Sequence, residues 1–252
     1  MADIAITVDG GTSKRLLTAG KYCGKDILVT ATGGGGGEPE PPDDGKTRLY
    51  ITVPANSMPD RDPPRNQVPL YIQQSVANGV TIDWGDGSDP ETLPGTRNVN
   101  TTHTYQTAGD FVITLDPAEG CTLGLGAGNS VNCVLGPTKN NGRVYCGMLQ
   151  RAVIGSRGIR SIGICAFQYC SSLASVTIPD GVTSIGTYAF HNCYGVKEYH
   201  LLPTTPPSLS NENAFNSIPS DCIIYVPVGS LEAYQTATNW STYADQMQEE
   251  PA

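Results

Sequence analysis

Three aspartates, one inside a Gly-Asp-Gly turn and one on each side of it, are the first residues whose type and spacing could support chemistry. Asp83, Asp86 and Asp89 lie close together in the sequence, and clustered carboxylates are the ligands that a hard cation such as Ca²⁺ takes. The segment lacks the twelve-residue EF-hand loop. Asp86 and Ser88 can instead bond to backbone N–H groups of their own turn. We therefore expect a structural turn here, with no metal.

Other candidates for catalysis are few. The three histidines, His103, His191 and His200, do not pair at metal-ligand spacing. The glycine run 33–37 precedes a proline tract and lacks the Lys-Ser/Thr of a phosphate-binding loop. No Gly-x-Ser-x-Gly nucleophile elbow occurs. The sequence does not exclude a pair of catalytic carboxylates on opposite sides of a cleft, as in a glycosidase. We expect no catalytic residue, no cofactor and no enzymatic activity; an enzyme with an unrecognised site is the less favoured alternative.

Repeats are the elements that must position any binding residue. The segment Ile162-Gly163-x-x-Ala166-Phe167-x-x-Cys170 recurs 23 residues later as Ile185-Gly186-x-x-Ala189-Phe190-x-x-Cys193. Degraded copies flank this pair, around Cys146 and around Phe215. A period of this length indicates a solenoid, in which each unit buries its apolar face only against its neighbours. The cysteines at matching positions should be buried, reduced thiols.

This pattern, Ile-Gly-x-x-Ala-Phe-x-x-Cys-x-x-Leu, resembles the BspA-like leucine-rich repeats of bacterial surface and phage-encoded proteins, over about residues 145–245. The resemblance implies recognition of a surface or partner, without catalysis. After the repeats, Ser230 should cap a C-terminal helix that covers the open end of the stack. One face of this helix should pack against the last repeat; a sugar-binding surface of aromatic rings is the less favoured alternative. The residues of this face are Leu231, Tyr234, Ala237, Trp240, Tyr243 and Met247.

Residues 47–117 contain alternating segments at 48–53, 80–84 and 111–115 that predict strands. The segments Trp84-Gly85-Asp86-Gly87-Ser88, His103-Thr104-Tyr105 and Gly109-Asp110-Phe111 resemble the polycystic-kidney-disease (PKD) type of immunoglobulin-like domain in order and spacing. The resemblance implies a β-sandwich that serves as a spacer or as a carbohydrate- or protein-binding module, with a structural role for its histidine. A Pro-rich insert at 59–69 departs from the pattern and leaves the early strands undefined.

Residues 1–32 should form a small β unit with short strands around 4–8 and 27–29. The string from Gly20 to Ile27 resembles segments that open some tail- and fibre-associated proteins of phages of gut bacteria. This resemblance implies attachment to a virion or to sister chains; an ordinary edge hairpin is the alternative. Residues 33–46 are predicted to be a Gly/Pro linker, first flexible and then extended.

Composition and charge exclude some classes of binding partner. A net charge of −9 and a pI near 4.7 count against nucleic acid. No apolar run is long enough to span a membrane. The start of the sequence has neither a basic region nor an apolar stretch, so we expect no secretory signal and a reducing compartment. The disulfide state stays open for Cys23, Cys121, Cys133, Cys146, Cys165 and Cys222.

The sequence therefore predicts a mainly β protein with four parts: an N-terminal attachment β unit (1–32), a linker (33–46), a PKD-like, Ig-like β-sandwich (47–117), and a short leucine-rich-repeat solenoid with a C-terminal capping helix (118–252). Its expected partners are other virion proteins, through the N-terminal unit, and a glycan or protein of the bacterial surface. Oligomeric state stays open, a homo-oligomer included. A phage virion accessory protein is favoured over a bacterial cell-surface adhesin, because a protein released by lysis needs no export signal.

Alternation along the repeat strands defines a candidate partner-binding face. If Val176 and Ile178 point inward, then positions 175 and 177 point outward, and the repeat registers carry these positions to the neighbouring strands. The face mixes charge, hydroxyl groups and an aromatic ring, which suits recognition; a plain solvated sheet is the alternative. Its predicted members are Arg151, Val153, Ser175, Thr177, Glu198, His200, Ile223 and Tyr225.

Overall fold

The computed structural model describes residues 21–22, 25–26, 43–55, 65–126, 132–137 and 143–251. Contacts divide the chain into two compact units, Met1–Glu40 and Pro41–Ala252. In the first unit, β1 (Lys21–Tyr22) and β2 (Lys25–Asp26) pair antiparallel. The strands expected around 4–8 and 27–29 and the glycine run of the linker lie outside the described residues.

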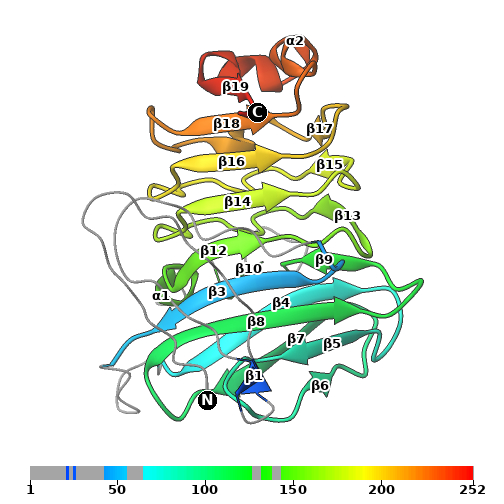
Figure 1. Ribbon diagram of the computed structural model, residues 1–252, viewed down its shortest axis with the longest axis vertical. Helices are drawn as coiled ribbons and strands as arrows, with labels where there is room; N and C mark the ends of the chain where they lie inside the picture. The colour runs from blue at the N-terminus through cyan, green and yellow to red at the C-terminus, as the bar shows by residue number, and fades with distance from the viewer. Residues whose placement is uncertain are drawn as a thin grey trace. The chain divides into compact units, whose positions relative to one another are not determined.

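The second unit is mainly β and is built on two large sheets (Figure 1). The strands of the first sheet, in chain order, are β3 (Thr47–Val53), β5 (Val80–Asp83), β6 (Glu91–Thr92), β8 (Gly109–Pro117), β12 (Leu149–Val153), β14 (Ser175–Ile178), β16 (Glu198–Leu201), β18 (Ile223–Val226) and β19 (Met247–Glu249). The strands of the second are β4 (Gln67–Gln74), β7 (Arg97–Thr104), β9 (Leu123–Leu125), β13 (Ile159–Ile162), β15 (Ser184–Ile185) and β17 (Ser208–Leu209). Their spatial orders are β19-β18-β16-β14-β12-β3-β8-β5-β6 and β17-β15-β13-β9-β4-β7.

Parallel strands repeat along the first sheet from β12 to β18 (Figure 1). Ala152 pairs with Val176, Val176 with Tyr199, and Tyr199 with Ile224. All four side chains are fully buried. The register expected from the repeat spacing is therefore confirmed.

One aromatic ring from each repeat fills the interior between successive strands. Phe167 stacks on Phe190 with ring centroids 5.1 Å apart, and Phe190 stacks on Phe215 at 5.0 Å. Burying such a ring contributes about 1.5–3 kcal/mol. Cys170 and Cys193 are free thiols with no exposed surface, so the prediction that they are buried is confirmed.

The strands before residue 126 continue directly into the repeat strands. In the first sheet, β3 pairs antiparallel with β8 on one side and with β12 on the other. In the second, β9 pairs with β4 and with β13. An end of a repeat stack exposes unpaired backbone that must be covered, and here residues 47–126 cover it. The boundary expected between 117 and 118 falls between β8 and β9, inside this one unit.

Residues 43–46 were expected to belong to an unstructured linker, and this part of the prediction is wrong. The carbonyl oxygen of Asp44 accepts a hydrogen bond from Nη2 of Arg157 (2.9 Å), and that of Gly45 accepts one from the Arg157 backbone N–H (3.2 Å). Gly45 has φ +82°, and a Cβ there would lie 2.8 Å from Cβ of Arg157. Composition suggested a linker and gave no sign of these contacts, because the hydrogen-bond partner of these carbonyl groups, Arg157, lies more than a hundred residues later in the sequence.

The Pro-rich insert expected at 59–69 also ends inside a strand. Pro69 belongs to β4 and lies opposite Thr102 of β7. The pairing of β4 with β9 covers only residues 72–74. Proline is tolerated where a strand lacks a neighbour on one side, because no ladder bond needs its missing N–H.

The single capping helix expected after residue 230 is divided into three elements. Helix α2 (Leu231–Thr236) is followed by the 3₁₀ helix η3 (Trp240–Gln246) and then by β19, which holds Met247 in the sheet. Between them Asn239 takes a left-handed conformation, φ +66°, and its amide donates to the Leu209 carbonyl (2.9 Å). The side chain of Ser230 makes no capping hydrogen bond.

Residues of this segment pack on the last aromatic ring of the repeats. Trp240 and Tyr243 are buried and lie 5.4 and 5.7 Å from the last stacked ring, Phe215. Another 3₁₀ helix, η2 (Glu212–Phe215), carries that ring.

A disulfide joins the short hairpin of β10 (Asn132–Cys133) and β11 (Gly136–Pro137) to helix α1 (Arg143–Cys146). The bond links Cys133 and Cys146, two of the cysteines whose state the sequence left open. Cys121, Cys165 and Cys222 are free and buried; Cys23 lies outside the described residues. Within the described ranges, no helix is long and apolar enough to cross a membrane.

We predict that a chain starting at Asp43 folds with an unchanged melting temperature, because the contacts of the second unit begin there. A chain starting at Lys46 should fold but lose about 1–3 kcal/mol of unfolding free energy, since Arg157 and Ser156 lose their partners at 43–45. Chemical denaturation of both chains measures the difference. Equal stabilities would show that these hydrogen bonds contribute nothing, and unfolding of the longer chain would contradict the division into two units.

We also predict that Cys170→Ser costs about 1–3 kcal/mol of unfolding free energy, because it buries a hydroxyl without an assured partner. Cys193→Ser is the matched control and should cost less, since the Cys193 thiol already donates to the Phe167 carbonyl (3.2 Å) and a hydroxyl can do the same. Equal losses in urea denaturation, or ready labelling of both thiols in the native protein, would contradict this packing.

Candidate functional site

The eight residues of the predicted face lie in two rows across neighbouring strands. Each row crosses β12, β14, β16 and β18 in register. The first row is Arg151, Ser175, Glu198 and Ile223, and the second is Val153, Thr177, His200 and Tyr225.

Two members of the second row do not present surface as expected. Val153 is 7% exposed and Thr177 is 5% exposed, whereas the other six residues are partly exposed. Across the strands, Val153 lies beside Arg48 and Thr177 beside His200. Short side chains between longer cross-strand neighbours lie low on the face of a sheet. We therefore restrict the candidate face to Arg151, Ser175, Glu198, His200, Ile223 and Tyr225.

His200 contacts two carboxylates and one aromatic ring at this face. Its Nδ1 lies 2.7 Å from Oε1 of Glu250, and its Nε2 lies 3.7 Å from Oε1 of Glu198. Its ring stacks on Tyr225 with centroids 5.1 Å apart and an interplanar angle of 20°. The result is an ordered surface that offers carboxylate acceptors beside an aromatic ring.

The face also extends beyond the repeats, which the sequence did not indicate. The guanidinium of Arg151 lies 5.1 Å from the ring centroid of Tyr50 on β3, in the range of a cation–π contact. Tyr50 is opposite Arg151 in the β3–β12 pairing. The alternation of the sequence predicts that Arg48 and Tyr50 lie on the same face of their strand. No local sequence pattern showed that this strand lies beside the repeats.

The aspartate cluster forms a structural turn, as predicted. Oδ1 of Asp83 accepts the Gly85 backbone N–H (2.9 Å), and Oδ1 of Asp86 accepts the backbone N–H (3.0 Å) and hydroxyl (2.6 Å) of Ser88. Asp89 makes no hydrogen bond or ion pair with another described residue. Across the part of the chain that the structure describes, no group of three or more His, Cys, Asp or Glu residues could hold a metal ion.

His103 is likewise structural, as expected. Its Nε2 lies 2.7 Å from Oδ2 of Asp86, and its ring stacks on Trp84 at 4.7 Å with an interplanar angle of 13°. The hydroxyl of Tyr105 donates to the Trp84 carbonyl (2.9 Å). The segments 84–88 and 103–105 therefore meet in one cluster that holds the turn, and Phe111 of the third segment packs on Tyr105 with ring centroids 4.3 Å apart.

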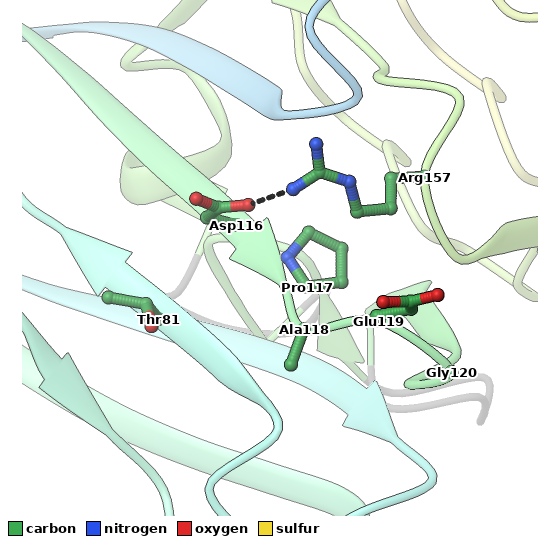
Figure 2. Close-up of a pocket in the computed structure, with 7 residues that line it drawn as sticks. All are labelled: Thr81, Asp116, Pro117, Ala118, Glu119, Gly120 and Arg157. Atoms are coloured by element: carbon green, nitrogen blue, oxygen red, sulfur yellow. Dashed lines mark hydrogen bonds and ion pairs between the residues drawn. The ribbon is translucent and has the colours of Figure 1, made fainter.

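A hollow of about 520 Å³ lies where the earlier strands meet the repeats (Figure 2). Two of its charged residues form an ion pair, in which Oδ1 of Asp116 binds Nη1 of Arg157 (2.8 Å); Oδ2 of Asp116 also binds Nζ of Lys46 (2.9 Å). Figure 2 shows the Asp116–Arg157 pair at one side of the hollow and the turn that carries Glu119 at the other. This arrangement joins two parts of the fold.

These features define a protein with registered repeat strands and an ordered, partly exposed face on them. Residues 144–235 match the family of the BspA type leucine rich repeat region, in 6 copies. The chain therefore contains a BspA-type leucine-rich repeat region, which is generally a non-enzymatic binding module. No curated protein matches the chain.

We predict that Asp86 contributes to stability at neutral pH and loses this contribution in acid. Burial of Asp86 tends to raise its pKa, but hydrogen bonds from Ser88 and His103 outweigh burial and lower the pKa from 3.8 to about 2. Because the folded pKa lies below the unfolded one, the contribution is complete above 3.8 and disappears as pH falls through about 2.

The measurement is the melting temperature between pH 6 and pH 2. Asp86→Asn should start lower and fall less steeply below pH 4 than the unmodified protein. Asp89→Asn is the control and should follow the unmodified protein. If Asp86→Asn also followed it, the turn would not depend on the carboxylate.

Proposed function

We propose that this protein is a non-enzymatic adhesion protein whose repeats present a binding face to the bacterial surface. The observation that carries the proposal is the pair of registered rows on β12, β14, β16 and β18, within a BspA-type repeat region. Polar, charged and aromatic side chains lie side by side there and are held in order by the strands beneath them. Interfaces draw much of their affinity from such anchored Tyr and Arg side chains.

We further propose that residues 47–117 are a PKD-like, Ig-like sandwich and that residues 118–252 form a solenoid. The cluster of Trp84, His103 and Tyr105 supports the first assignment, and the stacked Phe rings support the second. In this arrangement the sandwich covers one end of the solenoid, and α2 with η3 covers the other. The sandwich then acts as a rigid base that carries the binding face.

The proposed setting is a phage virion, with residues 1–32 attaching the protein to other virion proteins. The resemblance of the string from Gly20 to Ile27 to phage tail and fibre proteins supports this setting. A bacterial cell-surface adhesin is the second candidate, and the BspA-type repeats favour it equally. Immunogold labelling of purified virions and of intact cells distinguishes the two settings.

We predict that Glu198→Ala combined with Tyr225→Ala weakens binding to host cells or to their wall polysaccharide about tenfold or more. The double substitution removes the stacking partner of His200 and one of its two carboxylate neighbours. Binding is measured by sedimentation of labelled protein with cells or with purified wall material.

The matched control is Asn98→Ala combined with Thr102→Ala, two exposed residues of β7. This control should bind as the unmodified protein does. Undiminished binding by a folded Glu198/Tyr225 variant would remove the face from consideration and direct attention to the turn at 85–89.

A further inference from the structure

Two buried amides on the turns of adjacent repeats point their nitrogens at a single imidazole nitrogen. Gln168 and Asn192 are each 8% exposed. Nε2 of Gln168 lies 3.0 Å from Nδ1 of His191, and Nδ2 of Asn192 lies 3.2 Å from the same atom. The hydroxyl of Tyr194 donates to Oδ1 of Asn192 (2.6 Å), which turns the amide nitrogen toward His191.

This arrangement determines which nitrogen of His191 carries the proton. Because Nδ1 faces amide donors, it must accept, and the proton of the neutral ring is then on Nε2. Burial lowers the pKa of His191 below its usual 6.5, so the ring is neutral at pH 7. No described residue accepts a hydrogen bond from Nε2. The side chain therefore offers a single, oriented N–H donor at the surface.

Two tyrosine rings lie beside the His191 ring. The ring of Tyr188 lies 5.0 Å from that of His191, and the ring of Tyr169 lies 6.2 Å from it. Tyr188 is 36% exposed and Tyr194 is 61% exposed, which makes them two of the larger exposed apolar side chains. We refer to Tyr169, Tyr188, His191 and Tyr194 as the aromatic ridge.

The repeat fold does not require these aromatic residues. At the 23-residue spacing, Tyr188 corresponds to Cys165 in the preceding repeat and Tyr194 corresponds to Ser171. Tyr188 has φ +59° and the equivalent Cys165 has φ +58°, so the left-handed conformation belongs to the repeat turn, whereas the aromatic side chain is specific to this copy.

We propose that the aromatic ridge is a carbohydrate-binding site that takes a neutral sugar unit of a polysaccharide. A sugar hydroxyl has the lone pairs to accept the Nε2–H of His191, and the flat tyrosine rings can cover the apolar C–H face of a pyranose. A cation beside the ridge is engaged within it: the Arg143 guanidinium lies 3.8 Å from the ring centroid of Tyr169 and donates to its hydroxyl (3.0 Å). The net charge of −9 opposes a polyanionic partner.

A peptide is the less suitable occupant. An extended peptide binds by adding to an open strand edge, and a helical one needs an apolar groove. The aromatic ridge lies on the turns at 164–169 and 187–195, with neither feature. Because it lies outside the strands of the sheet face, it does not rest on the function proposed above.

The test is affinity electrophoresis of the full chain in gels that contain mannan, dextran, xylan or mixed-linkage β-glucan, one per gel. Titration calorimetry with oligosaccharides of a retarding polymer then gives Kd. We expect at least one polymer to retard the protein. Tyr188→Ala and His191→Phe should each weaken binding about tenfold, the first by removing a stacking ring and the second by removing one hydrogen bond.

Two controls make the result decisive. Asn98→Ala combined with Thr102→Ala, on β7 and outside both surfaces, should leave retardation unchanged. The sheet face is tested separately, by binding of the Glu198/Tyr225 variant to host cells, so failure of the sheet face and failure of the aromatic ridge are distinguishable. Because His191→Phe leaves two buried amides unpaired, circular dichroism and melting temperature confirm its fold, and the exposed Tyr188→Ala gives an independent result. Retardation by no polymer, equal retardation of all variants, or binding to gelatin in place of every polysaccharide would overturn the proposal.

Discussion

The pairing of β3 with β12 is the constraint on which the second unit depends. A stack of parallel strands ends in a row of backbone N–H and C=O groups that need partners. Strand β3 supplies those partners because it pairs antiparallel with β12, the first of the parallel strands. The buried hydroxyl of Thr47 at the start of β3 accepts the Gly155 backbone N–H (3.1 Å) just beyond the end of β12. Because of this pairing, the earlier strands and the repeats form one sheet.

Several other features follow from the same junction. A Cβ on Gly155 would lie 2.3 Å from the Lys46 carbonyl oxygen, so a glycine is required for the two segments to approach. Asp116 and Arg157, which line the hollow, form an ion pair, and Lys46 also pairs with Asp116. The contact of Arg151 with Tyr50 also exists only because β3 lies beside β12. The candidate face and the base beneath it are therefore parts of one surface.

The three histidines show how surroundings assign different roles to one residue type. His103 is held between a carboxylate and an indole ring and stabilises a turn. His200 lies between two carboxylates and stacks on a tyrosine at the surface. His191 is oriented by two amides and keeps one donor exposed. In the sequence only His103 belongs to a recognised segment, and no pattern distinguishes His191 from His200.

Local pattern was sufficient for much of the fold. Alternation located β3, β5 and β8, and the repeat spacing gave the register from β12 to β18 and the buried cysteines, because period and burial are properties of neighbouring residues along the chain. Strands β4, β7 and β9 carry weaker alternation, with a proline in one and glycine in another, and were not found. The face was predicted residue by residue, but the low exposure of Val153 and Thr177 depends on side chains from other strands.

The sequence by itself therefore determined the repeat, the turn chemistry of the aspartates and which strand residues share a face. Only the tertiary structure decided that residues 43–46 bond to Arg157, that β3 completes the repeat sheet, that the C-terminal helix ends early so that Met247 can enter a strand, and that Gln168, Asn192 and Tyr194 meet around His191. Each of these depends on hydrogen bonds or packing between segments far apart in the chain or on separate turns. Such contacts are selected by the free energy of the whole fold, and no local pattern encodes them.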